Sequence, residues 1–181
     1  MDAQTNVTST GQKIRTVDIT VTAAMAALVF LGTYIFKIPT ISGYVHLGDC
    51  MILLTVALFG MKKGAIAGAI GGGLSDFIGG YFYWVVPTLL IKCMWAIVMG
   101  LIMHKVLKDK KGSFLIGAIA GGVLHIIAYT LVRVVLYGGK TAIIEIPALA
   151  FQTGAGIVIG FVIYMLLKKS GVAGRLSGMV K

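Results

Sequence analysis

Long apolar runs alternate with short polar or charged segments along this chain of 181 residues. A hydropathy reading separates six runs. They cover roughly Val17–Phe36, Leu47–Phe59, Ala65–Gly80, Val85–Val106, Phe114–Leu136 and Ile144–Leu167. Because a membrane span needs about 20 mostly apolar residues, the pattern predicts an all-α bundle of six transmembrane helices. The second and third runs are short, and the segment 60–64 between them predicts a tight turn.

The basic residues concentrate on alternate connections between these runs. With the N-terminus placed inside the cell, cytoplasmic segments hold 12 of the 16 basic residues. The outer side holds only Lys37, Arg133 and Lys140, while Lys92 lies within a run. Since cytoplasmic loops carry an excess of Lys and Arg, both termini are predicted to be cytoplasmic. Residues 1–16 and 169–181 are then cytoplasmic tails that flank a membrane domain at 17–168.

The composition explains the net charge of +10 without a nucleic-acid partner. The chain is 58% hydrophobic and 12% charged, whereas soluble domains are about 45–50% apolar and about 25% charged. The positive charge lies between apolar runs, as in a protein embedded in a lipid bilayer. Cys50 and Cys93 both lie in apolar surroundings and predict neither a disulfide nor a metal site.

Polar residues inside the predicted spans are the candidate functional groups, because such residues are expensive in lipid and usually face the bundle interior. Three runs carry a polar and aromatic stripe in the outer half of the membrane, at helical spacing. The stripes are Trp84, Thr88, Lys92 and Trp95 in the fourth run, His125, Tyr129, Arg133 and Tyr137 in the fifth, and Glu145, Ala148 and Gln152 in the sixth. Their convergence predicts a small-molecule pocket with a few placed polar groups.

The predicted substrate-binding residues combine these stripes with the third run and the loop 38–49. They are Tyr44, His46, Asp76, Trp84, Thr88, Lys92, His125, Tyr129, Arg133 and Gln152. The loop is predicted to be a lid whose Tyr44 and His46 point inward. The alternatives are that Lys92 reaches the outer headgroups, that His125 is a hydrogen-bonded core residue, and that Trp84 belongs to an interfacial aromatic belt. A further alternative is that Arg133 and Glu145 pair with each other or with headgroups.

Small residues recur every four positions on two runs. Ala23 and Ala27 form one stripe in the first run, and Gly64, Gly68 and Gly72 form another in the third. Stripes of this kind let helices approach closely in lipid. They predict either internal packing or a docking surface for a partner membrane subunit.

Sequence motifs for catalysis, metal binding or nucleotide binding are missing. The triplet 139–141 matches the end of a phosphate-binding loop, but the leading Gly of that motif would fall at Val134. No closely spaced His, Cys or carboxylate cluster suggests a metal. We therefore predict no catalytic residue, no metal and no cofactor, and uphill transport would need a partner with an energy source.

Five segments of the chain form a recognisable pattern, namely Pro39–Thr40, Gly43–Asp49, Gly60–Gly68, Leu74–Tyr81 and Pro87–Lys92. Together they resemble the S components of energy-coupling factor (ECF) transporters, and most closely the riboflavin-type branch. The resemblance implies a multi-pass protein of the bacterial plasma membrane that binds a vitamin near the outer face, under the first outer loop. It also implies docking through Ala23 and Ala27 to a transmembrane scaffold subunit with two cytoplasmic ATPases, which hydrolyse the ATP.

The resemblance leaves the vitamin open among pyridoxine, hydroxymethylpyrimidine and riboflavin. Two other functions stay open beside it. One is a self-sufficient proton-coupled carrier that uses Asp76, Glu145 and His125. The other is a membrane-embedded enzyme that uses His46, Asp49, His125 or Glu145, although no local catalytic signature supports it.

Overall fold

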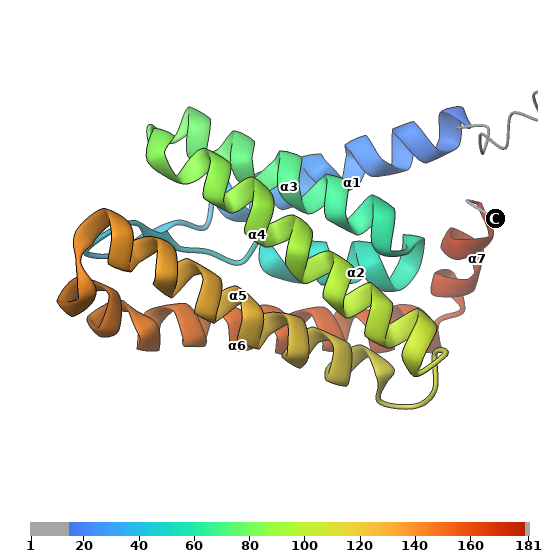
Figure 1. The fold of residues 1–181 in the computed structure, drawn as a ribbon. Helices are drawn as coiled ribbons and strands as arrows, with labels where there is room; N and C mark the ends of the chain where they lie inside the picture. The colour runs from blue at the N-terminus through green and yellow to red at the C-terminus, as the bar shows by residue number, and fades with distance from the viewer. Residues whose placement is uncertain (1–14, 180–181) are drawn as a thin grey trace, which may run out of the picture.

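The structure, a computed structural model, describes residues 15–179 and is helical apart from one short antiparallel hairpin (Figure 1). Each predicted apolar run becomes one helix, which confirms the all-α fold class. The elements in chain order are α1 (Thr16–Tyr34), β1 (Ile38–Pro39), β2 (Tyr44–Val45), α2 (Asp49–Phe59), α3 (Met61–Ile78), α4 (Phe82–Gly100), the π-helical η1 (Leu101–Val106), α5 (Ser113–Tyr137), α6 (Gly139–Lys169) and α7 (Val172–Gly178).

Four helices are long and apolar enough to cross a membrane, namely α1, α4 continued through η1, α5 and α6. The apolar helix α2 has 11 residues, a length of about 16 Å, against a hydrocarbon core about 30 Å thick. Helix α3 has 18 residues but carries Lys62, Lys63 and Asp76. The structure therefore supports a multi-pass membrane protein, while a count of six spans remains a prediction.

Single glycines join two pairs of neighbouring helices. Gly60 connects α2 to α3 with φ of 90°, and Gly138 connects α5 to α6 with φ of 84°. Residues other than glycine rarely adopt this backbone conformation. The tight turn predicted at 60–64 is thus narrowed to one residue, and α3 begins at Met61.

The short helix α2 lies at the centre of the bundle and contacts α1, α3, α4 and α6. Its Ile52, Leu53 and Val56 are fully buried and pack in the main core with Trp95 and Met99 of α4. Because α2 has about half the length of its neighbours, it fills only one half of the bundle. The segment between α1 and α2, which contains the β1–β2 hairpin, folds into the other half (Figure 1).

The stripe formed by Gly64, Gly68 and Gly72 faces the interior of the bundle. A Cβ atom at Gly64 would lie 2.3 Å from Val56, and one at Gly68 would lie 3.1 Å from Ile52. At Gly72 the added atom would meet α4 in the same way. The assignment of these glycines to partner docking is therefore corrected, because the space beside them is already occupied by α2 and α4.

The alanine stripe of α1 has the opposite orientation. Ala23 and Ala27 are exposed, whereas Ala26 and Val29 of the same helix are buried against the bundle. Helix α1 lies at one edge, beside α3 (Figure 1). Internal packing therefore does not explain this stripe within the described residues.

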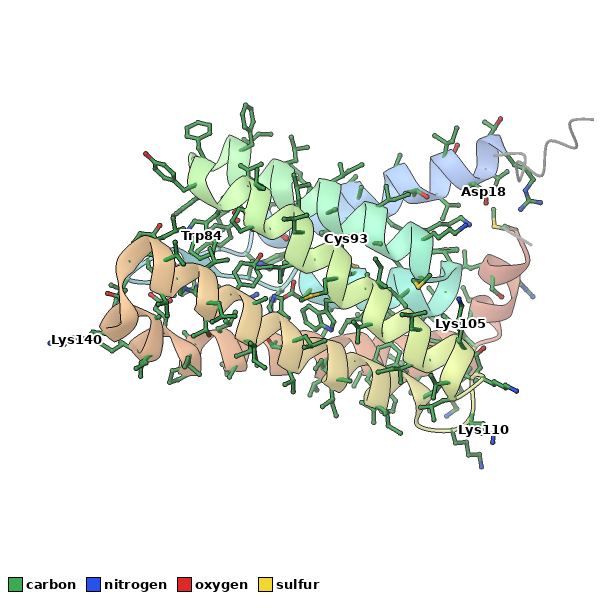
Figure 2. All side chains as sticks on the ribbon, in the orientation of Figure 1. Asp18, Trp84, Cys93, Lys105, Lys110 and Lys140 are labelled. Atoms are coloured by element: carbon green, nitrogen blue, oxygen red, sulfur yellow. The ribbon has the colours of Figure 1, made fainter. Side chains whose placement is uncertain are left out.

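The basic segments of the chain come together at one end of the bundle. Helix α1 begins there and α7 ends there (Figure 1), and Lys105 and Lys110 lie at this end while Lys140 lies at the other (Figure 2). Helix α7 falls inside the predicted tail 169–181 and packs against α2 and α6. Hydropathy did not predict it because it has only 7 residues and includes Arg175. Residues 1–14 of the predicted N-terminal tail lie outside the described residues.

Candidate functional site

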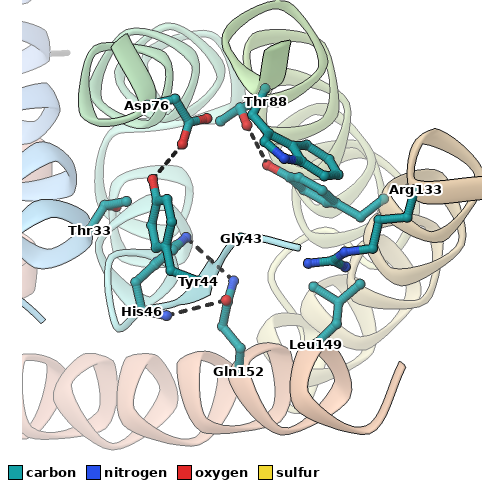
Figure 3. Close-up of a pocket in the computed structure, with 11 residues that line it drawn as sticks. Thr33, Gly43, Tyr44, His46, Asp76, Thr88, Arg133, Leu149 and Gln152 are labelled. Carbon is teal, nitrogen blue, oxygen red and sulfur yellow. Dashed lines mark hydrogen bonds between the residues drawn. The ribbon is translucent and has the colours of Figure 1, made fainter. Parts of the chain in front are cut away.

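A cavity of about 40 Å³ lies in the half of the bundle that α2 leaves open (Figure 3). Eight of the ten predicted substrate-binding residues line it, which are Tyr44, His46, Asp76, Trp84, Thr88, Tyr129, Arg133 and Gln152. Thr33, Gly43 and Leu149 complete the lining. The polar stripes of the fourth, fifth and sixth predicted runs thus converge on one place, together with the end of α3 and the loop before α2.

The loop before α2 folds inward and is held in place by its hairpin. Pro39 pairs with Tyr44 between the two strands, and this pairing turns Tyr44 toward α3. The Tyr44 hydroxyl donates a hydrogen bond of 2.5 Å to Asp76 Oδ1. Burial, and secondly the charge of Asp76, raise the pKa of Tyr44, so its phenol stays protonated and remains the donor. Tyr44 reaches inward as predicted, while the action of the loop as a lid remains a prediction.

The tip of the loop is anchored to α5 and α6. The backbone N–H of Ser42 donates to Glu145 Oε1 at 2.8 Å, and Arg133 Nε donates to the Ser42 hydroxyl at 3.2 Å. Arg133 Nη2 also lies 3.5 Å from Glu145 Oε2, and both side chains are buried. The alternative that Arg133 and Glu145 pair with each other is therefore correct, and the pair also holds the loop.

His46 lies on the cavity wall in its neutral form. The backbone N–H of His46 donates to Gln152 Oε1 at 3.2 Å, and its ring Nδ1 accepts from the backbone N–H of Gly48 at 3.2 Å. Burial lowers the pKa of His46 to about 4, although the nearby Asp49 opposes the shift. At neutral pH this side chain therefore adds no charge to the cavity.

Lys92 and His125 are not among the residues that line the cavity, so their contact with a ligand remains a prediction. Lys92 Nζ lies 2.5 Å from Asp49 Oδ1 and 3.1 Å from His125 Nε2. Gln152 Nε2 donates to the second oxygen of Asp49 at 2.7 Å. Lys92 is 1% exposed and Asp49 is fully buried, so the alternative in which Lys92 reaches the outer headgroups is wrong. His125 is a hydrogen-bonded core residue, as its alternative proposed, and its Nδ1 lies 3.1 Å from Thr153.

Aromatic side chains form the apolar part of the wall. The rings of Trp84 and Tyr129 lie 5.6 Å apart, and the Arg133 guanidinium lies 5.3 Å from the Trp84 ring. Trp84 is only 5% exposed, whereas the neighbouring Tyr83 is 81% exposed. Trp84 therefore belongs to the cavity, and Tyr83 has the exposure expected of an interfacial aromatic belt.

Three lining residues and one buried counter-charge were not predicted. Thr33 is a polar residue in the first predicted run, so the rule that identified the other polar residues could have found it. Gly43 and Leu149 line the cavity by position and carry no chemical signal. Asp49 was visible as an acid at the start of a short span, and a buried acid needs a partner such as Lys92.

The described residues hold no group of three or more His, Cys, Asp or Glu side chains placed to bind a metal ion. The chemical features of the site are hydrogen-bond donors, acceptors and aromatic faces. Such an arrangement can bind and orient a small polar aromatic molecule.

Comparison with known proteins identifies a matching family and a relative. The family described as "ECF-type riboflavin transporter, S component" matches residues 13–169. A protein of Pyrococcus woesei, described as an uncharacterized protein in the gap 3' region, is 36% identical over 132 residues. That similarity covers 73% of this chain and 87% of the Pyrococcus protein.

Proposed function

Because the chain belongs to the family of ECF-type riboflavin transporter S components, we propose that its cavity binds one water-soluble vitamin for uptake. Membership makes the chain a vitamin-binding subunit of a membrane transporter and not an enzyme. The candidate vitamins are pyridoxine, hydroxymethylpyrimidine and riboflavin. We also propose that the chain lies in the bacterial plasma membrane and needs no cofactor of its own.

The observation that carries this proposal is the convergence of buried polar side chains on one cavity under an inward-folded loop. Ligand sites for small molecules have volumes of about 300–1,000 Å³, against about 40 Å³ here. A vitamin therefore requires the loop 38–48 to move away from α5 and α6. We propose that the loop opens toward the outer side and closes over the bound vitamin.

The proposed orientation places both termini in the cytoplasm and the cavity near the outer face. The clustering of basic segments at the end opposite the cavity supports it. In a variant without Cys50 and Cys93, a cysteine at Lys140 should react with a membrane-impermeant maleimide in intact cells. A cysteine at Lys110 should react only after the cells are permeabilised. The reverse pattern of labelling would show that the orientation is wrong.

The proposed partners are a transmembrane scaffold subunit and two cytoplasmic ATPases, with Ala23 and Ala27 as the docking stripe. The exposure of these alanines supports the assignment. The close approach of two helices in lipid needs small residues at the contact, and the stripe offers them on a face that the bundle leaves free.

Uptake into liposomes tests the proposed energy source. With the scaffold and ATPases incorporated, the chain should accumulate a radiolabelled vitamin only when ATP is present inside the vesicles. The chain alone should give no accumulation with or without a pH gradient. Accumulation by the chain alone under a pH gradient would instead support the self-sufficient proton-coupled carrier.

A further inference from the structure

Three buried polar atoms on residues that line the cavity have no hydrogen-bond partner. They are Thr33 Oγ1, Asp76 Oδ2 and Arg133 Nη1, and their residues are 2%, 4% and 4% exposed. Only five such atoms occur in the described part of the chain, so most of them are found at this one place. Buried polar groups are nearly always hydrogen-bonded, and these three are therefore suited to a ligand's polar groups.

The unpaired atoms differ in chemistry and in position. Asp76 and Thr33 lie on one side of the cavity, and Arg133 lies on the other side (Figure 3). A carboxylate oxygen only accepts hydrogen bonds, whereas a guanidinium only donates them. The complementary ligand has a hydroxyl or N–H group at one end and an acceptor, such as a carbonyl or ring nitrogen, at the other. The Trp84 ring, next to Arg133, provides an aromatic face for a planar ring.

The charges at the cavity are balanced in pairs. Arg133 pairs with Glu145 on one side, and Asp76 on the other side is near the ammonium group of Lys37. Lys37 Nζ donates to the backbone oxygen of Ser75 at 3.4 Å, next to Asp76 in the chain. Burial lowers the pKa of Lys37, and the charge of Asp76 opposes that shift.

The side chains below the cavity and on its wall add no unbalanced charge either. Beneath the cavity, Lys92 is paired with Asp49, and His46 on the wall is neutral at physiological pH. A phosphate ester would bring about −1.5 to −2 charges into this site. An uncompensated buried charge is strongly unfavourable, so the arrangement disfavours phosphorylated ligands.

We propose that this cavity selects a neutral heteroaromatic vitamin, with its donor end at Asp76 and its acceptor end at Arg133, and rejects the vitamin's phosphate ester. The inference rests on the proposed function and specifies the chemical class of its substrate. Under this proposal, the paired charges of the cavity let free vitamins bind and exclude their phosphorylated forms.

Calorimetric titration of the purified chain in lipid nanodiscs tests the proposal with matched pairs. The pairs are pyridoxine, riboflavin and hydroxymethylpyrimidine, each with its own phosphate ester. We expect at least one free vitamin to bind, and its ester to bind at least about 100-fold more weakly. An ester that binds as tightly as its free vitamin overturns this inference and leaves the proposed function standing. If no member of any pair binds, the proposed function and the inference both fail.

Two variants separate ligand contact from anchoring of the loop. Asp76→Asn keeps the shape of the side chain and should weaken binding of the free vitamin about tenfold to 100-fold. It should also reduce the difference in affinity between the vitamin and its ester, because it removes a negative charge. Tyr44→Phe removes the hydrogen bond to Asp76 but keeps the carboxylate, so the difference in affinity between vitamin and ester should persist. Asp109→Asn, in an exposed loop, is the control. If Asp76→Asn changes neither the affinity for the free vitamin nor the difference in affinity between vitamin and ester, Asp76 does not bind the donor end of the ligand.

Discussion

Replacing Lys92 with Met is expected to destabilise the bundle by about 3–5 kcal/mol, because it leaves Asp49 charged, buried and without a counter-charge. The two side chains lie 2.5 Å apart and are almost completely inaccessible to solvent. Gln152 and the ring of His125 complete the hydrogen bonds of the pair. Gln152 is uncharged and cannot replace Lys92 as the counter-charge of Asp49, so the loss is expected to be large.

A double replacement distinguishes a charge effect from a packing effect. Asp49→Asn combined with Lys92→Met removes both charges, and it should recover most of the stability that either single change loses. Lys140→Met, at an exposed lysine, is the matched control and should leave stability unchanged. Thermal unfolding in detergent provides the measurement. If Lys92→Met has a wild-type midpoint, the buried ion pair does not exist in the folded protein.

Replacing Ala23 and Ala27 together with Leu is expected to abolish uptake while vitamin binding stays near the wild-type value. The two alanines lie one helical turn apart on the exposed face of α1. Leucines there add bulk and should prevent close backbone approach by a scaffold helix. The cavity lies inside the bundle, away from the exposed face of α1 that carries the two alanines. The ligand contacts should therefore remain.

Copurification of the scaffold and ATPases with the double Leu variant measures the effect on assembly. A calorimetric titration of the same variant measures binding. Ala24→Leu, at an exposed neighbour on the same helix, is the matched control for added bulk. Normal assembly and uptake by the double variant would place the docking surface elsewhere, and joint loss of binding and assembly would indicate a misfolded bundle.

The helices and most of the site were predictable because lipid imposes a strong constraint on sequence. Long spans appear as apolar runs, and a polar side chain inside a span must face the interior. Spacing of four residues then places His125, Tyr129 and Arg133 on one face, and all three are buried in the structure. Helical spacing of this kind identified five of the cavity's lining residues without any tertiary information, whereas Asp76, Tyr44 and His46 were predicted as polar groups of the third run and the outer loop.

The depth of each residue and its partner were not predictable from spacing. The Lys92–Asp49 pair joins positions 43 residues apart, and Asp49 reaches Lys92 only because α2 begins deep inside the bundle. Small residues were ambiguous for a related reason. Periodicity places Gly64 on a stripe just as it places Ala23, but only the fold shows that α2 already covers Gly64 while Ala23 stays exposed.

The most direct test of the central claim, that this chain alone binds a vitamin, is to identify what it retains. The protein would be purified from cells grown with all three candidate vitamins and then denatured. Mass spectrometry would identify and quantify the small molecules that are released. The account predicts one of these vitamins in an equimolar ratio to the protein, and a reduced ratio from Asp76→Asn. Release of no vitamin, with no binding in a subsequent titration of the purified chain, would contradict it.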